Sequence, residues 1–394
     1  MGDDGDMARA LLLSGPLGLG HEMPVQSLRT LLREAGWSVR TLDSMALLGG
    51  AAARAGQRVF DTLMAVPGLY DGLHFAHLRT GSALSVRMDS AATARTARML
   101  RAELDREPAD VVISVFATGA GAAAGLKDAA LVGRRSALAT AAPVPRAVVY
   151  CPDVAVHRLW VHEGTDLFLV TSPAAAASVR RFRPRAPIAV VPPPVRRAFY
   201  DAPSRREARQ QLEIPDDARC VLLIDSGWGF APIAAAAVRL ADAGVHVLAV
   251  AGRNRRLERE LRDAAGHHRL LTPFGFTDAV PRLMAAADLV VSLPGATTCS
   301  EARVVGRPLL LLDVMPGHGR DNLLHELEQG NAGTCGPRAA DIAASALAVL
   351  ETAAGPDPSH EPPRWEPAYA AALARIGLNV TVTPRMEEEC APFS

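Results

Sequence analysis

The feature that most constrains the fold of this chain is the alternation of apolar strands and short helices over residues 275–322. Residues 288–293 (DLVVSL) and 308–314 are apolar on both faces, which is typical of strands inside a parallel sheet. Each strand ends in a glycine-containing turn, at residues 294–296 and at residues 316–318. Strands joined in this way by helical crossovers predict a doubly wound α/β domain.

The first of these turns opens a helix that carries Glu301. In doubly wound sheets, ligands lie at the carboxyl ends of the strands, where helix N-termini direct free N–H groups at anions. A carboxylate near the start of such a helix suits a ribose diol, because both hydroxyls can donate to it. The arrangement predicts a pocket for a nucleotide sugar.

The alternation extends through the chain in two series, so we predict two Rossmann-like domains joined by a linker. Three prolines in 188–194 end the first series, because proline cannot continue a central strand. The charged stretch 199–217 then leads into the second series. The predicted strands are 10–13, 38–42, 110–115, 147–151 and 167–171, followed by 221–225, 245–251, 270–275, 288–293 and 308–314. The predicted domains are 1–200, 201–354 and a C-terminal extension, 355–394, with a last helix at 368–376 and a tail that we expect to be disordered.

Composition fits a soluble α/β protein of a cytosolic compartment. The 394 residues can form two domains, each with its own core. No apolar run reaches the roughly 18–20 residues that span a bilayer, and the acidic N-terminus is unlike a signal peptide. The five cysteines are scattered without a CxxC pair, which favours reduced thiols over a zinc site or a disulfide framework. We expect no metal site and no nucleic-acid partner.

The two halves of the chain differ in charge although the net charge is zero. Residues 1–200 contain 23 Arg and Lys against 17 Asp and Glu, and the remainder contains 19 against 25. A basic N-terminal half favours contact with an anionic membrane surface. Chance scatter explains the difference equally well, and the sequence leaves both interpretations open.

Four motifs resemble one family of enzymes. The Pro-Gly-x-x-Thr-x-x-Glu pattern of residues 294–301 resembles the donor-binding signature of GT-B glycosyltransferases related to the lipid-II-forming N-acetylglucosaminyltransferase. Residues 14–28 (SGPLGLGHEMPVQSL), 63–75 (LMAVPGLYDGLHF) and 152–172 are similar to the monogalactosyldiacylglycerol synthase and processive diacylglycerol glucosyltransferase branch. Together these stretches extend over most of the chain.

The resemblance implies a GT-B fold, in which two Rossmann-like domains face each other across a cleft. It implies an inverting, metal-independent transfer of a hexose from a UDP-sugar, a co-substrate and not a cofactor, to diacylglycerol or a related membrane lipid. Such an enzyme would lie in the cytoplasm, at the inner face of the cell membrane. A natural-product or other small hydroxyl acceptor, a nucleotide-sugar epimerase and a non-catalytic nucleotide- or lipid-binding relative remain alternatives. The oligomeric state does not follow from the sequence.

The resemblance also assigns donor-binding residues in the second domain. A glycine turn at Gly227 and Gly229 either holds the diphosphate or is a tight βα turn, and Asp225 before it departs from the family pattern. Arg253 either pairs with a phosphate or is solvated, and Phe276 either contacts the nucleobase or belongs to the core. The strongest candidates follow the fourth strand of this series, residues 288–293: they are Gly295, Thr297, Thr298 and Glu301. For Glu301 the alternative is a role at the helix dipole.

The loop 316–322 is expected to touch the hydroxyls of the transferred sugar. Asp321 and Asn322 lie at its end, and Asn322 matches the family. His318 and Gly319 stand where relatives carry Gln and Glu, so the identity of the sugar does not follow.

His21 and Asp153 are the predicted catalytic residues. His21 follows the glycine-rich turn of Gly18 and Gly20, where an imidazole can take the proton of the acceptor hydroxyl. Asp153 either acts as this base or orients His21. An apolar segment either packs in the core or lies in the membrane interface and admits the lipid; its residues are Leu63, Met64, Leu69, Tyr70, Leu73 and Phe75.

Overall fold

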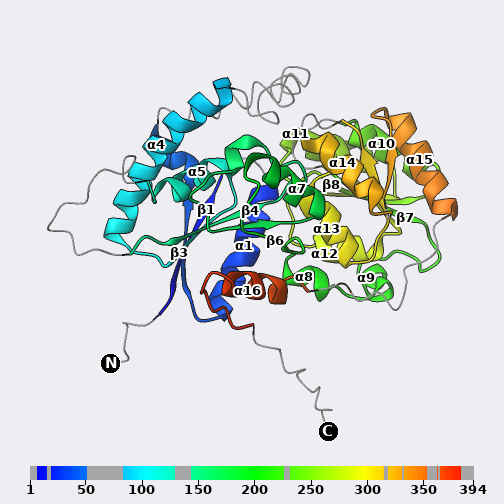
Figure 1. Cartoon of the computed structure of the whole chain (residues 1–394). Helices are drawn as coiled ribbons and strands as arrows, with labels where there is room; N and C mark the ends of the chain where they lie inside the picture. The colour runs from blue at the N-terminus through cyan, green and yellow to red at the C-terminus, as the bar shows by residue number, and fades with distance from the viewer. Residues whose placement is uncertain are drawn as a thin grey trace, which may run out of the picture.

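The chain folds into two parallel, six-stranded sheets that lie side by side (Figure 1). The computed structural model describes residues 7–15, 19–50, 83–128, 143–225, 231–314, 318–330, 332–352, 362 and 364–382. The strand orders are β2-β1-β3-β4-β5-β6 and β12-β11-β10-β7-β8-β9. The predicted α/β class, with two Rossmann-like sheets, is therefore confirmed.

The strands match the predicted series, with ends shifted by a few residues at most. The first sheet contains β1 (Arg9–Ser14), β2 (Ser38–Asp43), β3 (Val111–Ser114), β4 (Arg146–Cys151), β5 (Leu167–Val170) and β6 (Ile188–Val190). The second contains β7 (Cys220–Ile224), β8 (His246–Val250), β9 (Leu271–Phe274), β10 (Leu289–Ser292), β11 (Leu309–Leu312) and β12 (Ala332–Cys335). Two edge strands were not among the predicted ones. Strand β6 is only three residues long and lies in the stretch that ends the predicted first series, and β12 (AGTC) is partly exposed and lacks an apolar run.

Helices cover both faces of each sheet. In the first domain they are α1 (Leu19–Glu34), η1 (Ser44–Leu48), α4 (Ala83–Arg106), α5 (Ala117–Gly125), η3 (Arg158–Trp160) and α7 (Pro173–Phe182). Those that follow are α8 (Arg197–Tyr200), α9 (Arg205–Gln211), α10 (Ile233–Asp242), α11 (Arg255–Ala265), α12 (Val280–Ala286), α13 (Ala296–Val304), α14 (His318–Glu328), α15 (Ala339–Thr352) and α16 (Glu366–Ala374).

Strand β1 shows why the strands are apolar on both faces. Its Leu12 belongs to a core cluster with Leu28 of α1, whereas Leu11 and Leu13 belong to a second cluster with Leu100 of α4. Successive side chains of a strand point to opposite faces, so helices on both faces require an uninterrupted apolar run.

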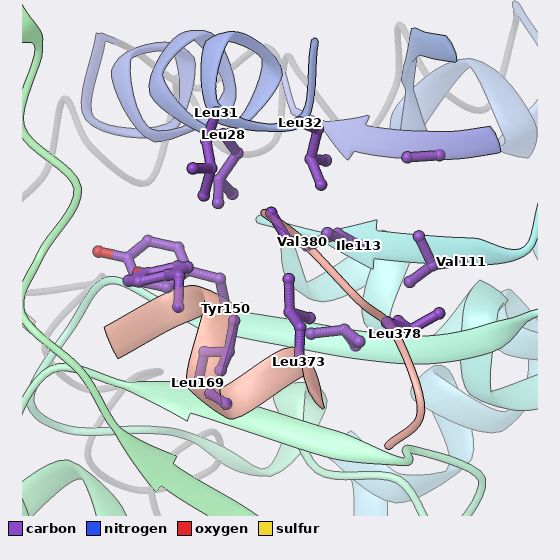
Figure 2. Close-up of a cluster of buried hydrophobic side chains, with 14 of the residues drawn as sticks. Leu28, Leu31, Leu32, Val111, Ile113, Tyr150, Leu169, Leu373, Leu378 and Val380 are labelled. Atoms are coloured by element: carbon purple, nitrogen blue, oxygen red, sulfur yellow. The ribbon is translucent and has the colours of Figure 1, made fainter. Parts of the chain in front are cut away.

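The C-terminal extension returns to the first domain. Helix α16 packs beside α1 on one face of the first sheet, where Leu373 and Tyr369 join the core cluster with Tyr150 (Figure 2). The Nε1 atom of Trp365 donates to the carbonyl of Val195 at 2.9 Å, and the rings of Trp365 and Tyr369 meet edge to face at 5.0 Å. The two ends of the chain therefore share one hydrophobic core, and 355–394 is not an independent appendage over its described part.

Each sheet has a point where the strand order reverses, between β1 and β3 and between β7 and β10. In doubly wound sheets, ligands bind in the crevice outside the carboxyl ends of such strands. At the first reversal, a Cβ atom on Gly15 would lie 2.4 Å from the ring of Phe116, so glycine is required for the loops after β1 and β3 to pack. These loops and those after β7 and β10 define where a substrate would lie.

Candidate active site

The amino end of α13 follows β10 and forms the first part of the site. Gly295 caps the helix in extended conformation (φ −79°, ψ 125°) and, as a glycine, contributes no side-chain cap hydrogen bond. Among the described residues, no atom lies within 4 Å of a Cβ atom built on Gly295. Thr297 and Thr298 lie half-buried in the first turn. An anionic group can therefore approach the free N–H groups at the positive end of the helix dipole.

Glu301 lies one turn further along α13 and is only 5% exposed. Its Oε1 atom accepts from Nη2 and Nε of Arg196 at 3.2 and 3.4 Å. Burial raises the pKa of Glu301 to about 7, and the charge and hydrogen bonds of Arg196 partly offset this shift. The alternative in which Glu301 stabilises the helix dipole is wrong, because the first turn of α13 contains no acidic residue.

Arg196 is a site residue that sequence reasoning missed. It caps α8 in the connection between the domains, and its guanidinium lies 4.9 Å from the centre of the Phe199 ring. The sequence shows only one arginine among many in a charged linker. Its role follows from the burial of Glu301, which depends on how α8 and α13 pack.

A second cluster lies at the carboxyl ends of β8 and β9. The guanidinium of Arg253 lies 4.9 Å above the ring of Phe276, which is 57% exposed, so the assignment of Phe276 to the core is wrong. Arg253 is not simply solvated either, because its Nη2 atom lies 3.4 Å from Oε2 of Glu22 on α1. An exposed ring beside a cation offers a flat surface of the kind on which a nucleobase stacks.

Asp225, directly after β7, is buried and turned toward the next loop. Its Oδ2 atom accepts from Nδ2 of Asn254 at 3.1 Å, while Oδ1 of Asn254 accepts from the first turn of α11. Asn254 therefore fixes the carboxylate that departs from the family pattern. The glycine turn of Gly227 and Gly229 lies outside the described residues, and its phosphate-binding role stays a prediction.

The third cluster joins the two domains. Helix α14 begins at His318, so Asp321 and Asn322 lie in its first turn and not in a loop, as the sequence had suggested. Nδ2 of Asn322 donates to Oδ1 of Asp153 at 3.1 Å, and Oδ1 of Asn322 accepts from the backbone N–H of Val154 at 3.2 Å. A residue assigned to the donor and a residue assigned to catalysis are thus in direct contact.

His21 lies on the helix that faces this part of the second domain. Helix α1 begins at Leu19, so Gly20 and His21 belong to its first turn and not to the loop before it. Helix α1 contacts α13 across the cleft. The catalytic roles of His21 and Asp153 stay predictions. The side chains of His21 and His318 lie outside the described residues, as do Gly18 and the segment with Leu63, Met64, Leu69, Tyr70, Leu73 and Phe75.

A cleft opens between the two domains next to Asn322. Helix α13 contributes Ser300 and Arg303, and Arg303 forms an ion pair with the buried Glu326 of α14. Sequence reasoning missed these residues, although they follow the predicted site residues at helical spacing and so lie on the same helix faces. The residues that line the cleft are Pro152, Val154, Thr171, Pro193, Ala296, Ser300, Arg303, Asn322, His325, Glu326 and Gln329.

The described residues include no group of three or more His, Cys, Asp or Glu side chains arranged to hold a metal ion. Burial raises the pKa of the thiols of Cys151, Cys220, Cys299 and Cys335, so these cysteines remain protonated. Within the part of the chain that the structure describes, no helix is both long and apolar enough to cross a bilayer.

Residues 232–330 match the model of the glycosyltransferase family 28 C-terminal domain. The second domain resembles family 28. This match contains α13, β11 and α14, the elements that carry most of the donor-site candidates. The resemblance drawn from the four motifs is confirmed in this domain.

Individual glycosyltransferases also match parts of this chain. The chain is 24% identical over 186 residues to a processive diacylglycerol beta-glucosyltransferase of Bacillus licheniformis, covering 46% of the chain and 48% of the relative. It is 27% identical over 188 residues to monogalactosyldiacylglycerol synthase 3 of Arabidopsis thaliana, covering 44% and 40%. It is 34% identical over 195 residues to the N-acetylglucosamine transferase of Mycobacterium avium that acts on a pyrophosphoryl-undecaprenol substrate, covering 48% and 46%. The matched segments thus span less than half of each relative.

Solved structures confirm the GT-B fold over nearly the whole chain. MurG of Acinetobacter baumannii superposes with a TM-score of 0.52 at 12% identity, covering 88% of this chain and 90% of that one. UGT89C1 of Arabidopsis thaliana, in complex with UDP-L-rhamnose, superposes with a TM-score of 0.54 at 15% identity, covering 88% and 89%. At such identities the similarity shows the fold alone.

Proposed function

We propose that this protein is an inverting glycosyltransferase that moves a hexose from a UDP-sugar to diacylglycerol or a related membrane lipid. The observation that carries the proposal is the contact of Asn322 with Asp153, where donor-site and catalytic candidates meet across the cleft. Two of the relatives support the lipid acceptor by their names, one a processive diacylglycerol beta-glucosyltransferase and the other a monogalactosyldiacylglycerol synthase. A two-domain glycosyltransferase needs such a meeting point, because the acceptor must reach the anomeric carbon of a sugar held by the other domain.

The second domain holds the donor. The N-terminus of α13 receives the diphosphate, and the glycine turn of 227–229 is the second phosphate-binding element that the sequence predicts. The ribose hydroxyls donate to Glu301, while the charge and hydrogen bonds of Arg196 favour the ionised form of its carboxylate. The nucleobase stacks beside Phe276 and Arg253, and the sugar lies at the start of α14, near His318 and Asp321.

Transfer is a single displacement at the anomeric carbon. The acceptor hydroxyl attacks this carbon, and its proton passes to Asp153 or His21. The bond between the anomeric carbon and the diphosphate oxygen breaks, and UDP leaves with the electron pair. The amino end of α13 stabilises the negative charge that develops on the leaving group. Displacement from the opposite face inverts the configuration of the anomeric carbon.

The acceptor places the enzyme at the inner face of the cell membrane. The segment 63–75 would reach the lipid interface, and the excess of basic residues in the first 200 positions would attract an anionic surface. The protein would then bind the bilayer from one side and draw single lipid headgroups into the cleft.

Release of UDP from a panel of UDP-sugars tests the proposal, with and without vesicles that contain diacylglycerol. We expect release from one sugar when the lipid is present, with formation of the β-linked glycolipid from an α-linked donor. Asp153→Asn should reduce the rate at least 100-fold while UDP binding persists, and Asp128→Asn serves as a surface control. Release with soluble hydroxyl compounds but not with lipid would instead favour a natural-product acceptor. UDP binding without turnover would indicate a non-catalytic relative.

A further inference from the structure

We infer that Asn322 is a positioning residue that aligns the carboxylate of Asp153 when the second domain docks on the first. The inference rests on the proposed function, in which Asp153 takes the acceptor proton. It assigns to Asn322 a role different from the contact with a sugar hydroxyl that the sequence suggested.

The geometry uses both ends of one amide. Nδ2 of Asn322 donates to Oδ1 of Asp153 at 3.1 Å, and the carbonyl oxygen accepts from the N–H of Val154 at 3.2 Å. The partners fix which end is which, because a reversed amide would face a carboxylate with its oxygen and an N–H with its NH₂ group. Two bonds from one planar group therefore fix the carboxylate of Asp153 relative to its own backbone.

Asn322 is nearly fully buried, which leaves little of its amide open to a ligand. The residue is 4% exposed, and its two bonds take up one of the two N–H donors and one of the two acceptor lone pairs of the amide. The hydrogen bond to the carboxylate is charge-assisted, so a sugar hydroxyl that displaced it would replace one of the stronger classes of hydrogen bond.

The two partners belong to different domains. Asp153 lies in the loop after β4 of the first sheet, and Asn322 lies in the first turn of α14, after β11 of the second sheet. Separation of the domains would remove the amide from Asp153. Alignment of the base is thus tied to closure over the donor, which limits proton transfer to the assembled site.

Steady-state kinetics separates this role from a sugar contact. We expect Asn322→Ala to lower kcat about 10- to 100-fold, while the donor KM and the affinity for UDP stay within about threefold, since the lost bond is of the charged class. Glu328→Ala, an exposed position on the same helix, should leave kcat and KM unchanged.

The exchanged pair N322D/D153N provides a second measurement. It restores an amide–carboxylate hydrogen bond and an acceptor for Val154, but moves the carboxylate to the other domain. We expect thermal stability to return to that of the wild type and UDP binding to persist, without recovery of kcat. A purely structural role for the whole pair, with Asp153 not acting as the base, would instead restore kcat together with stability.

The outcomes distinguish this inference from the proposed function. If the wild type transfers sugar and Asn322→Ala keeps its kcat, or raises the donor KM with kcat unchanged, the inference is overturned and the proposed function stands. If the wild type transfers no sugar to any lipid, the proposed function is overturned, and the inference with it.

Discussion

Two arginine–carboxylate pairs lie at opposite ends of the second sheet, and they are built for different purposes. Arg209 and Asp288 lie at the amino ends of the strands, and Arg196 and Glu301 lie beyond the carboxyl ends. Both pairs involve a nearly or fully buried side chain. They differ in how many partners share the charge.

The pair at the amino ends is fully satisfied. Arg209 is completely buried and donates to Asp288 and to the carbonyls of Pro215, Asp216, Ala218 and Ala286. Asp288 also accepts from Arg205 and from the backbone N–H of Cys220. Such a network ties α9 to the sheet, and no partner can leave without exposing a buried charge to an apolar surrounding.

The pair at the carboxyl ends leaves part of the hydrogen-bonding capacity of Glu301 unused among the described residues. In the described part of the chain, Glu301 accepts from Arg196 through one oxygen, and burial holds its pKa near 7. A carboxylate with a free oxygen beside a helix N-terminus can accept further hydrogen bonds from a ligand. The comparison teaches that the same residue types serve as scaffold or as binding group according to how many of their lone pairs the protein itself uses.

The largest expected effect comes from the scaffold pair. Asp288→Asn leaves the guanidinium of Arg209 buried without its counter-charge, so we expect the free energy of unfolding to fall by about 3–5 kcal/mol. Urea denaturation measures this. Arg206→Ala, on the same helix but 76% exposed, should change it by less than about 1 kcal/mol. Equal losses of unfolding free energy in the two variants would show that the buried pair contributes no more to stability than an exposed residue.

Glu301→Gln should weaken ligand binding and leave stability nearly unchanged, the opposite of a scaffold variant. It keeps the shape but removes the charge that the ribose hydroxyls would bind, so we expect UDP affinity to fall about 10- to 100-fold. Stability should change by less than about 1 kcal/mol, because no desolvated charge is left unpaired. Calorimetric UDP titration and urea denaturation test both parts. A loss of stability as large as that of Asp288→Asn would make Glu301 a scaffold residue as well.

The pH dependence sharpens the role of Glu301. With a pKa of about 7, its carboxyl group is mostly neutral at pH 6 and mostly ionised at pH 8. We expect UDP affinity to rise by roughly tenfold over this range, because only the ionised form accepts charge-assisted bonds from both hydroxyls. Glu301→Gln should be nearly flat. UDP titrations from pH 6 to 8, in a buffer of constant ionic strength, measure the rise.

Arg196 sets the position of that rise. Its charge lowers the pKa of Glu301, so Arg196→Ala should move the midpoint to higher pH, while Arg197→Ala should leave it in place. The contribution of Glu301 to folding stability changes with pH in the opposite direction to UDP affinity. The pKa of this group is raised from 4.5 by folding, so its contribution makes unfolding easier as pH increases from about 4.5 towards 7. A midpoint unmoved in Arg196→Ala would contradict the pairing.

The smallest effect should come from Glu22 and Arg253. The side chains of Glu22 and Arg253 are 41% and 62% exposed, and their charged atoms lie 3.4 Å apart. Exposed ion pairs contribute about 0–1 kcal/mol to stability. We expect Glu22→Gln to change the free energy of unfolding by less than about 1 kcal/mol, with the difference vanishing in high salt. A loss comparable to that of Asp288→Asn would show that this contact between domains is a second scaffold pair.

Much of the site could be predicted from local sequence. The turn at Gly295 and the helix that carries Glu301 follow from a buried strand that ends in a glycine turn, because strand ends and helix starts are local events. The start of α14 could not be placed, since residues 316–322 offer no strong capping signal, and Asn322 was assigned to a loop. Arg196 and Arg303 were missed because only the packing of distant elements shows which arginines face a carboxylate.

The sequence by itself determined the class of fold, the two series of strands and the candidate groups for a nucleotide sugar. Apolar runs on both faces admit no other arrangement than strands covered on two sides. Only the tertiary structure decided that α16 completes the core of the first domain, that Arg196 pairs with Glu301 and that Asn322 holds Asp153. These contacts join residues up to 219 positions apart, between Tyr150 and Tyr369, and no local periodicity encodes which surfaces meet when two domains close.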